Sequence, residues 1–90
     1  MNANNERVVS RLRGTISSFH AGETDVDAIL ASLRGEVGLA ENDGSGLADL
    51  VRLAEADIEE IRFTRLQAEQ RPAVARRLDE LAAALEDART

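Results

Sequence analysis

Apolar side chains recur along this chain at gaps of three and four residues, and this spacing predicts helices throughout. Such gaps place residues on one face of an α-helix, whose period is 3.6 residues. Four stretches carry an apolar stripe, over residues 5–20, 25–37, 46–70 and 72–88, and none alternates as a strand does. We therefore expect an all-α fold, a small four-helix arrangement in one domain, residues 1–90. The stripes are Val9, Leu12, Ile16 and Phe19; Val26, Leu30, Leu33 and Val37; Leu47, Val51, Ala54, Ile58 and Ile61; and Val74, Leu78, Leu81 and Leu85.

Polar side chains mark where the first three helices begin. A side-chain oxygen just before a helix accepts a hydrogen bond from one of its free N–H groups. By this criterion Asn4 or Asn5 caps the first helix, Thr24 the second and Ser45 the third.

The connections between the stripes predict two helical hairpins. Only three to five residues separate the first two helices, so these should run antiparallel. Residues 38–46 contain three glycines, and we expect them to form a flexible loop between the hairpins. Because proline lacks an N–H but suits the first position of a helix, Pro72 predicts a break near Arg71. The third helix, over residues 46–70, is then the longest.

Composition and charge narrow the classes of function. The chain has 17 acidic and 11 basic residues, a net charge of −6, and no cysteine. An acidic chain is a poor nonspecific binder of nucleic acid and favours a basic protein partner. No segment approaches the roughly 18 apolar residues of a membrane span. The first residues also lack the pattern of a signal peptide, so we expect a cytoplasmic protein with neither nucleic acid nor membrane as partner.

Two patterns contain part of a metal-binding or catalytic site but lack residues that such a site requires. If Glu41 begins an EF-hand loop, oxygen-bearing side chains fall at positions one, three, five and nine, and Gly46 falls at the required glycine. Position twelve is then Arg52, a cation where calcium needs a bidentate glutamate. His20 is the single histidine and has no companion that would make a zinc site or a general base. We therefore predict no metal, no cofactor and no enzymatic activity.

The acidic residues cluster around the first part of the third helix. Residues 41–60 hold seven acids and only one base, Arg52. Ion pairs with Arg52 and Arg62, within helical reach of Glu55 and Glu59, would give an ordinary solvated face. The alternative is an electrostatic docking surface for a basic partner. That candidate surface comprises Asp49, Glu55, Asp57, Glu59 and Glu60, with Phe63 and Leu66 adjoining.

Phe63 and Leu66 lie off the main stripe of the third helix. At 100° per residue they fall about 160° and about 100° from Leu47. Packing against the final helix is the favoured interpretation, and an exposed apolar patch for a partner is the alternative. Residues 61–80 carry a net +2, so a self-assembling homodimer that pairs them with the acidic segment is a second hypothesis.

The first third of the chain resembles a group of small bacterial proteins. Residues 13–23, Arg-Gly-Thr-Ile-Ser-Ser-Phe-His-Ala-Gly-Glu, precede a second helix over Asp25–Leu33. In the proteins that it resembles, a short helix ends in a Phe-x-x-Gly-Glu turn before the next helix, and several are cytoplasmic immunity or antitoxin-like factors. The resemblance implies no particular functional residue. It suggests a non-enzymatic protein–protein interaction module, an immunity- or antitoxin-type inhibitor of a basic partner.

Overall fold

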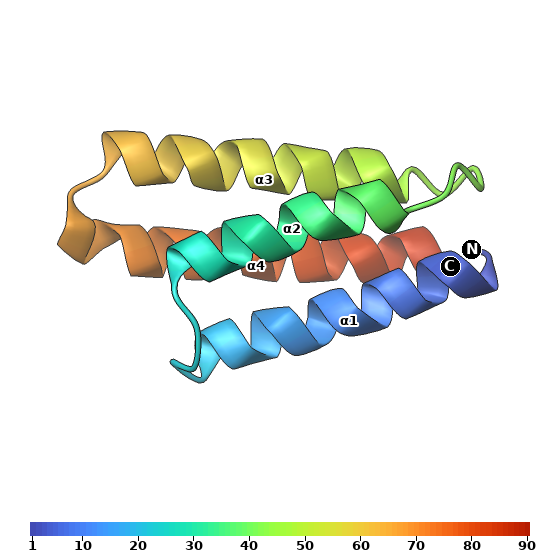
Figure 1. The fold of residues 1–90 in the computed structure, drawn as a ribbon, viewed down its shortest axis with the longest axis horizontal. Coiled ribbons are helices and arrows are strands. Elements are labelled where there is room, and N and C mark those ends of the chain that lie inside the picture. Colours follow the sequence, from blue (N-terminus) through green and yellow to red (C-terminus); the bar gives the residue numbers. More distant parts are fainter.

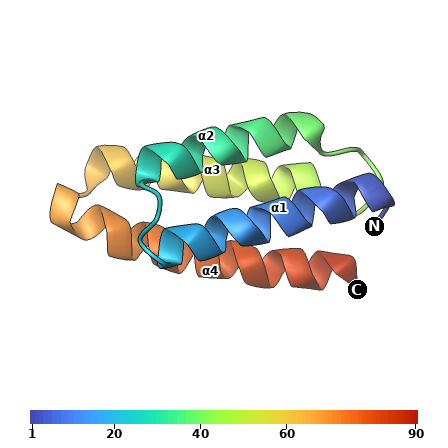
Figure 2. The same cartoon turned by 60° about the horizontal axis from the view of Figure 1, so that its bottom comes forward.

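The computed structural model describes all 90 residues, and they form four helices. These are α1 (Ala3–His20), α2 (Val26–Leu39), α3 (Leu47–Thr64) and α4 (Gln67–Arg89). Consecutive helices run antiparallel and pack side by side, and α4 closes the bundle against α1 (Figures 1 and 2). Both termini lie at the same end. The predicted all-α architecture of two helical hairpins is confirmed.

The apolar stripes meet in a single core at the centre of the bundle. Most of the predicted positions are buried, because each stripe faces the bundle axis. Val26, Val37 and Ile61 are only partly covered. The sixteen fully buried apolar residues are Val8, Val9, Leu12, Ile16, Phe19, Ile29, Leu30, Leu33, Leu47, Val51, Ala54, Ile58, Val74, Leu78, Leu81 and Leu85.

The predicted caps of the first two helices are wrong by one to three residues. Asn2, not Asn4 or Asn5, caps α1, and its side chain accepts a hydrogen bond from the Asn5 N–H at 2.8 Å. Asp25, not Thr24, caps α2 by accepting from the N–H three residues later at 2.8 Å. In each case several neighbouring residues are good caps, so the type of residue alone does not select one.

The N-cap of the third helix lies one residue after the predicted Ser45. Gly46 is the N-cap, with a φ of +75° that favours glycine, and no side chain caps the helix. The Ser45 hydroxyl reaches the Leu47 N–H only at 3.4 Å, too long for a strong bond.

The break between the last two helices lies at Arg65 and Leu66, earlier than predicted. Since α3 ends at Thr64, it has 18 residues, and the longest helix is the fourth, with 23, not the third. Pro72 lies inside the second turn of α4 and does not begin it. Pro72 cannot donate to the carbonyl of Ala68, four residues earlier, and both residues are exposed.

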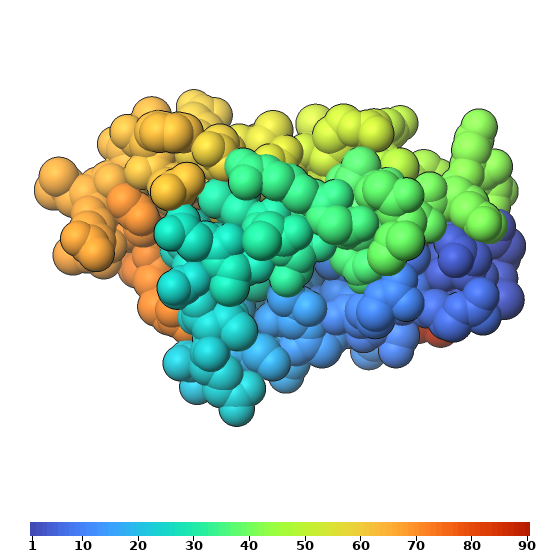
Figure 3. All heavy atoms as spheres, viewed as in Figure 1, coloured from blue at the N-terminus to red at the C-terminus, as the bar shows by residue number.

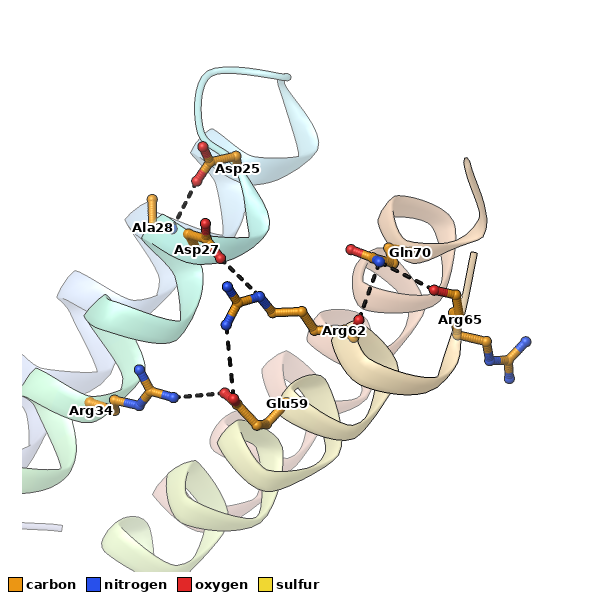
Figure 4. Close-up of polar contacts among 8 residues, drawn as sticks. All are labelled: Asp25, Asp27, Ala28, Arg34, Glu59, Arg62, Arg65 and Gln70. Carbon is orange, nitrogen blue, oxygen red and sulfur yellow. Dashed lines mark hydrogen bonds and ion pairs between the residues drawn. The ribbon is translucent and has the colours of Figure 1, made fainter. Parts of the chain in front are cut away.

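Gln70 accounts for the position of this break. Its side-chain amide donates to the carbonyls of Arg62 at 3.3 Å and Arg65 at 3.2 Å, which lie at the end of α3 (Figure 4). The backbone N–H of Gln70 donates to the Leu66 carbonyl at 3.1 Å, which starts α4. Gln70 thus supplies hydrogen-bond donors to backbone carbonyls at the end of α3 and at the start of α4. This permits a connection of only two residues, Arg65 and Leu66.

The loop predicted to be flexible is hydrogen-bonded to the start of α1. The Asn5 side chain is fully buried, accepts from the Glu41 N–H at 2.8 Å and donates to the Glu41 carbonyl at 2.8 Å. The Asn2 N–H donates to the Asp43 carboxylate at 2.8 Å. Hydrogen bonds from the Ser45 hydroxyl, and then from Asn2, hold the pKa of Asp43 well below its usual range.

The hairpin of α3 and α4 extends past the α1–α2 turn. Figure 1 shows the α3–α4 turn (orange) projecting at the left-hand end of the bundle. Arg71 braces this overhang, because its guanidinium lies 4.1 Å from the centre of the Phe19 ring and donates to the carbonyls of Phe19 and Thr24. Farther out than Arg71, neither α1 nor α2 covers the α3–α4 turn (Figure 1).

Candidate protein-binding surface on helix α3

Two of the acidic residues predicted to bind a partner are turned toward α2. Arg34 of α2 donates to Glu55 at 2.8 Å and to Glu59 at 2.6 Å. Figure 4 shows the Arg34–Glu59 contact beside a second arginine, Arg62, which pairs with Asp27 at 3.1 Å and with Glu59 at 3.9 Å. The hydrogen bond to Glu55, with the charge of Glu59, raises the pKa of Arg34 above its ordinary value. These carboxylates therefore join α2 to α3.

A third acidic residue is turned toward α4. Asp57 pairs with Arg77 at 2.7 Å. Of the ion pairs predicted within α3, only the one between Glu59 and Arg62 forms, and Glu55 takes Arg34 of α2 in place of Arg52. Since arginines neutralise these three acids, they do not form one open acidic surface.

The remaining two acidic residues lie on the outward side of α3. The Asp49 side chain is 82% exposed and pairs with Arg52 at 2.9 Å. Glu60 is exposed and takes part in none of the ion pairs of the structure. Of the five predicted acids, Glu60 is therefore the one with its charge wholly unmatched.

A second apolar stripe runs along this outward side. Leu53 is 60% exposed and Phe63 is 75% exposed, and Ala56 lies exposed between them. The positions Leu53, Ala56, Glu60 and Phe63 follow gaps of three, four and three, so they share one face opposite the core stripe. We call this surface the outer face of α3 and define it as Asp49, Arg52, Leu53, Ala56, Glu60 and Phe63.

Sequence reasoning missed the first half of this face. The sequence predicts Arg52 as a cation that excludes calcium and as a partner for neighbouring acids, and it singles out neither Leu53 nor Ala56. The signal was present in the sequence, because Leu53 and Ala56 precede Phe63 by ten and seven residues on the face away from Leu47. A search for two stripes on one helix would have found it.

The favoured interpretation of Phe63 and Leu66 as core residues is wrong. Leu66 is 73% exposed and belongs to the projecting α3–α4 turn. Figure 3 shows the side chains of α3 (yellow) along the upper edge of the molecule, and the turn (orange) standing out at its left-hand end. The final helix does not wrap these residues, because α3 ends before Leu66 and the chain reverses there.

The other groups of polar residues are weaker candidates for a functional site than the outer face of α3. A groove between α3 and α4 is lined by Arg65, Arg76 and Arg77 but also by Glu69 and Glu80, so its charge is mixed. The His20 Nε2 atom lies 2.9 Å from a carboxylate oxygen of Asp79. No three His, Cys, Asp or Glu side chains are grouped so that they would hold a metal ion. None of the helices combines the length and apolar character needed to cross a membrane.

Comparison of the chain with protein-family models, with curated proteins and with solved structures finds no match in any of the three.

Proposed function

We propose that this chain is a non-enzymatic protein-interaction module whose partner docks on the outer face of α3 and the adjoining α3–α4 turn. The observation that carries the proposal is the exposure of Leu53, Phe63 and Leu66, three large apolar side chains on one helix and the turn that follows it. Large apolar side chains exposed on one face, with charged residues beside them, are typical of interaction sites. Leu39, the other large exposed apolar residue, lies on α2.

Apolar contacts, more than charge, support this proposal. Glu55, Asp57 and Glu59 already have arginine partners within the chain, so a basic partner would have to displace them. Asp49 and Glu60 stay available at the rim, where charges affect association rate and specificity more than affinity. The proposed partner therefore presents apolar side chains and a few cations.

The finer functional class rests on the sequence alone. An immunity- or antitoxin-type inhibitor acting in the cytoplasm is the class that the resemblance of residues 13–33 suggests, and it remains part of the proposal. A small inhibitor of this kind needs a docking surface and no catalytic group, which agrees with an exposed apolar face on a rigid helix.

Capture from an extract of the source cells tests the proposal. The tagged chain is compared with a variant carrying Leu53→Ser and Phe63→Ser, and with Leu39→Ser as the matched control on α2. We expect the unaltered chain and the control to retain a protein that the double variant loses. An untagged copy of the chain counts as such a protein. Equal retention by all three chains would overturn the proposal, as would retention of nothing by a chain that also stays monomeric in sedimentation equilibrium at concentrations up to about 1 mM.

A further inference from the structure

We infer that the outer face of α3 binds a second copy of this chain, with the two α3 helices antiparallel and Ala56 at the two-fold axis. This inference rests on the proposed function, because it uses the same surface and names its occupant. In a symmetric pair each contact is made twice, so a self-complementary surface is required. The outer face of α3 meets that requirement in both shape and charge.

The charges of the face match under this symmetry. Arg52 lies four residues before Ala56 and Glu60 lies four residues after it. An antiparallel two-fold through Ala56 therefore brings Arg52 of each copy level with Glu60 of the other. Within one copy Glu60 has no ion-pair partner, and Arg52 is held only by the exposed Asp49. The pairing gives Glu60 the cation that the single chain does not supply.

The shape of the face suits close approach of two helices. Ala56 is exposed and small, so the two backbones can come together at the axis. Leu53 and Phe63 lie on opposite sides of Ala56 along the helix, and both point away from their own core. In the antiparallel pair both side chains exchange water for contact with the second helix.

Neighbouring acidic residues do not oppose the pairing. Glu55 and Glu59 are held by Arg34, and Asp57 is held by Arg77. Arg62 also pairs with Glu59, so each of these three acids beside the face has an arginine partner within its own copy, although the chain carries −6 overall. Antiparallel helices also place the positive end of each helix dipole beside the negative end of the other.

The size of the face predicts a weak dimer. An 18-residue helix is about 27 Å long, and each copy contributes one face of it. Such a contact falls below the roughly 1,200–2,000 Å² buried in standard stable interfaces. We expect a dissociation constant on the order of 10–100 µM, in the range of transient associations.

Charge reversal provides the test. In Arg52→Glu two acids face each other across the axis, and in Glu60→Arg two arginines do. We expect sedimentation equilibrium to show dimerisation of each variant at least about tenfold weaker than that of the unaltered chain. In an equimolar mixture of the two variants, both ion pairs re-form between unlike copies, so dimer affinity should return to the unaltered value. Circular dichroism of each variant checks that it is folded.

Two results would overturn the inference. One is a monomeric unaltered chain at concentrations up to about 1 mM, ten times the upper end of the expected range. The other is a mixture that dimerises no better than either variant alone. A monomeric chain that still captures another protein through Leu53 and Phe63 would remove the second copy as occupant and leave the proposed function standing. Capture that ignores these two residues would remove the proposed function itself.

Discussion

Removing the Asn5 side chain should cost more stability than any other exchange of an asparagine in this chain. Asn5 is fully buried, and its amide makes two hydrogen bonds of 2.8 Å to the N–H and carbonyl of Glu41. Asn5→Ala leaves the Glu41 N–H without a protein partner, at a cost of roughly 1–3 kcal/mol. It also removes one of the two hydrogen bonds to the Glu41 carbonyl, worth about 0.5–1.5 kcal/mol, while the Asp43 N–H still donates to that carbonyl at 3.0 Å. The better helix propensity of alanine returns about 0.5 kcal/mol. The sum of these contributions is about 1–4 kcal/mol, and we expect a net loss near the middle of this range, about 2–3 kcal/mol.

Thermal unfolding measures this loss. In a domain of this size 1 kcal/mol corresponds to about 4–8 °C in Tm, so Asn5→Ala should lower Tm by roughly 10–20 °C. Hydrogen exchange at the Glu41 amide should also accelerate, because Asn5 supplies its hydrogen-bond acceptor.

Asn42→Ala is the matched control. Asn42 lies exposed in the same loop, so its replacement should change stability by no more than about 0.5 kcal/mol. If Asn5→Ala and Asn42→Ala had the same Tm, and Glu41 exchanged equally fast in both, the loop would not be fastened as described.

Two further predictions concern Pro72 and Asp43. Pro72→Ala restores an N–H inside the exposed second turn of α4, so it should raise the free energy of unfolding by about 1–2 kcal/mol, as measured in urea. A lower free energy of unfolding would show that the proline stabilises α4. The lowered pKa of Asp43 in the folded chain stabilises it at neutral pH, and this contribution is lost as the pH falls below the unfolded-state value of about 4. The Tm difference between the unaltered chain and Asp43→Asn should therefore be largest near pH 7 and shrink below about pH 4, and a constant difference would contradict the role of the carboxylate.

The sequence was sufficient for the fold because the core stripes are long and regular. Leu47, Val51, Ala54 and Ile58 are all buried, as their spacing requires. The end of α3 was not predictable from Pro72 alone, since the Gln70 side chain caps α3 across a reversal of the chain. Such a contact depends on tertiary geometry that no local pattern contains.

Only part of the candidate surface was predictable for a similar reason. Clustering of acids along α3 is visible in the sequence, but Arg34 and Arg77, which neutralise most of them, come from other helices. The exposure of Leu66 follows from the end of α3 at Thr64, which Pro72 predicted several residues too late.

Cysteine cross-linking at Ala56 tests the role of the outer face of α3 most directly. The chain has no cysteine of its own, so Ala56→Cys introduces a single thiol at the proposed two-fold axis. Ala31→Cys, at an exposed alanine on α2, is the matched control. Under mild oxidation at about 100 µM, a concentration at which a weak dimer is populated, we predict rapid disulfide-linked dimers for Ala56→Cys and slow ones for Ala31→Cys. Equal rates for the two variants would contradict pairing through the outer face of α3.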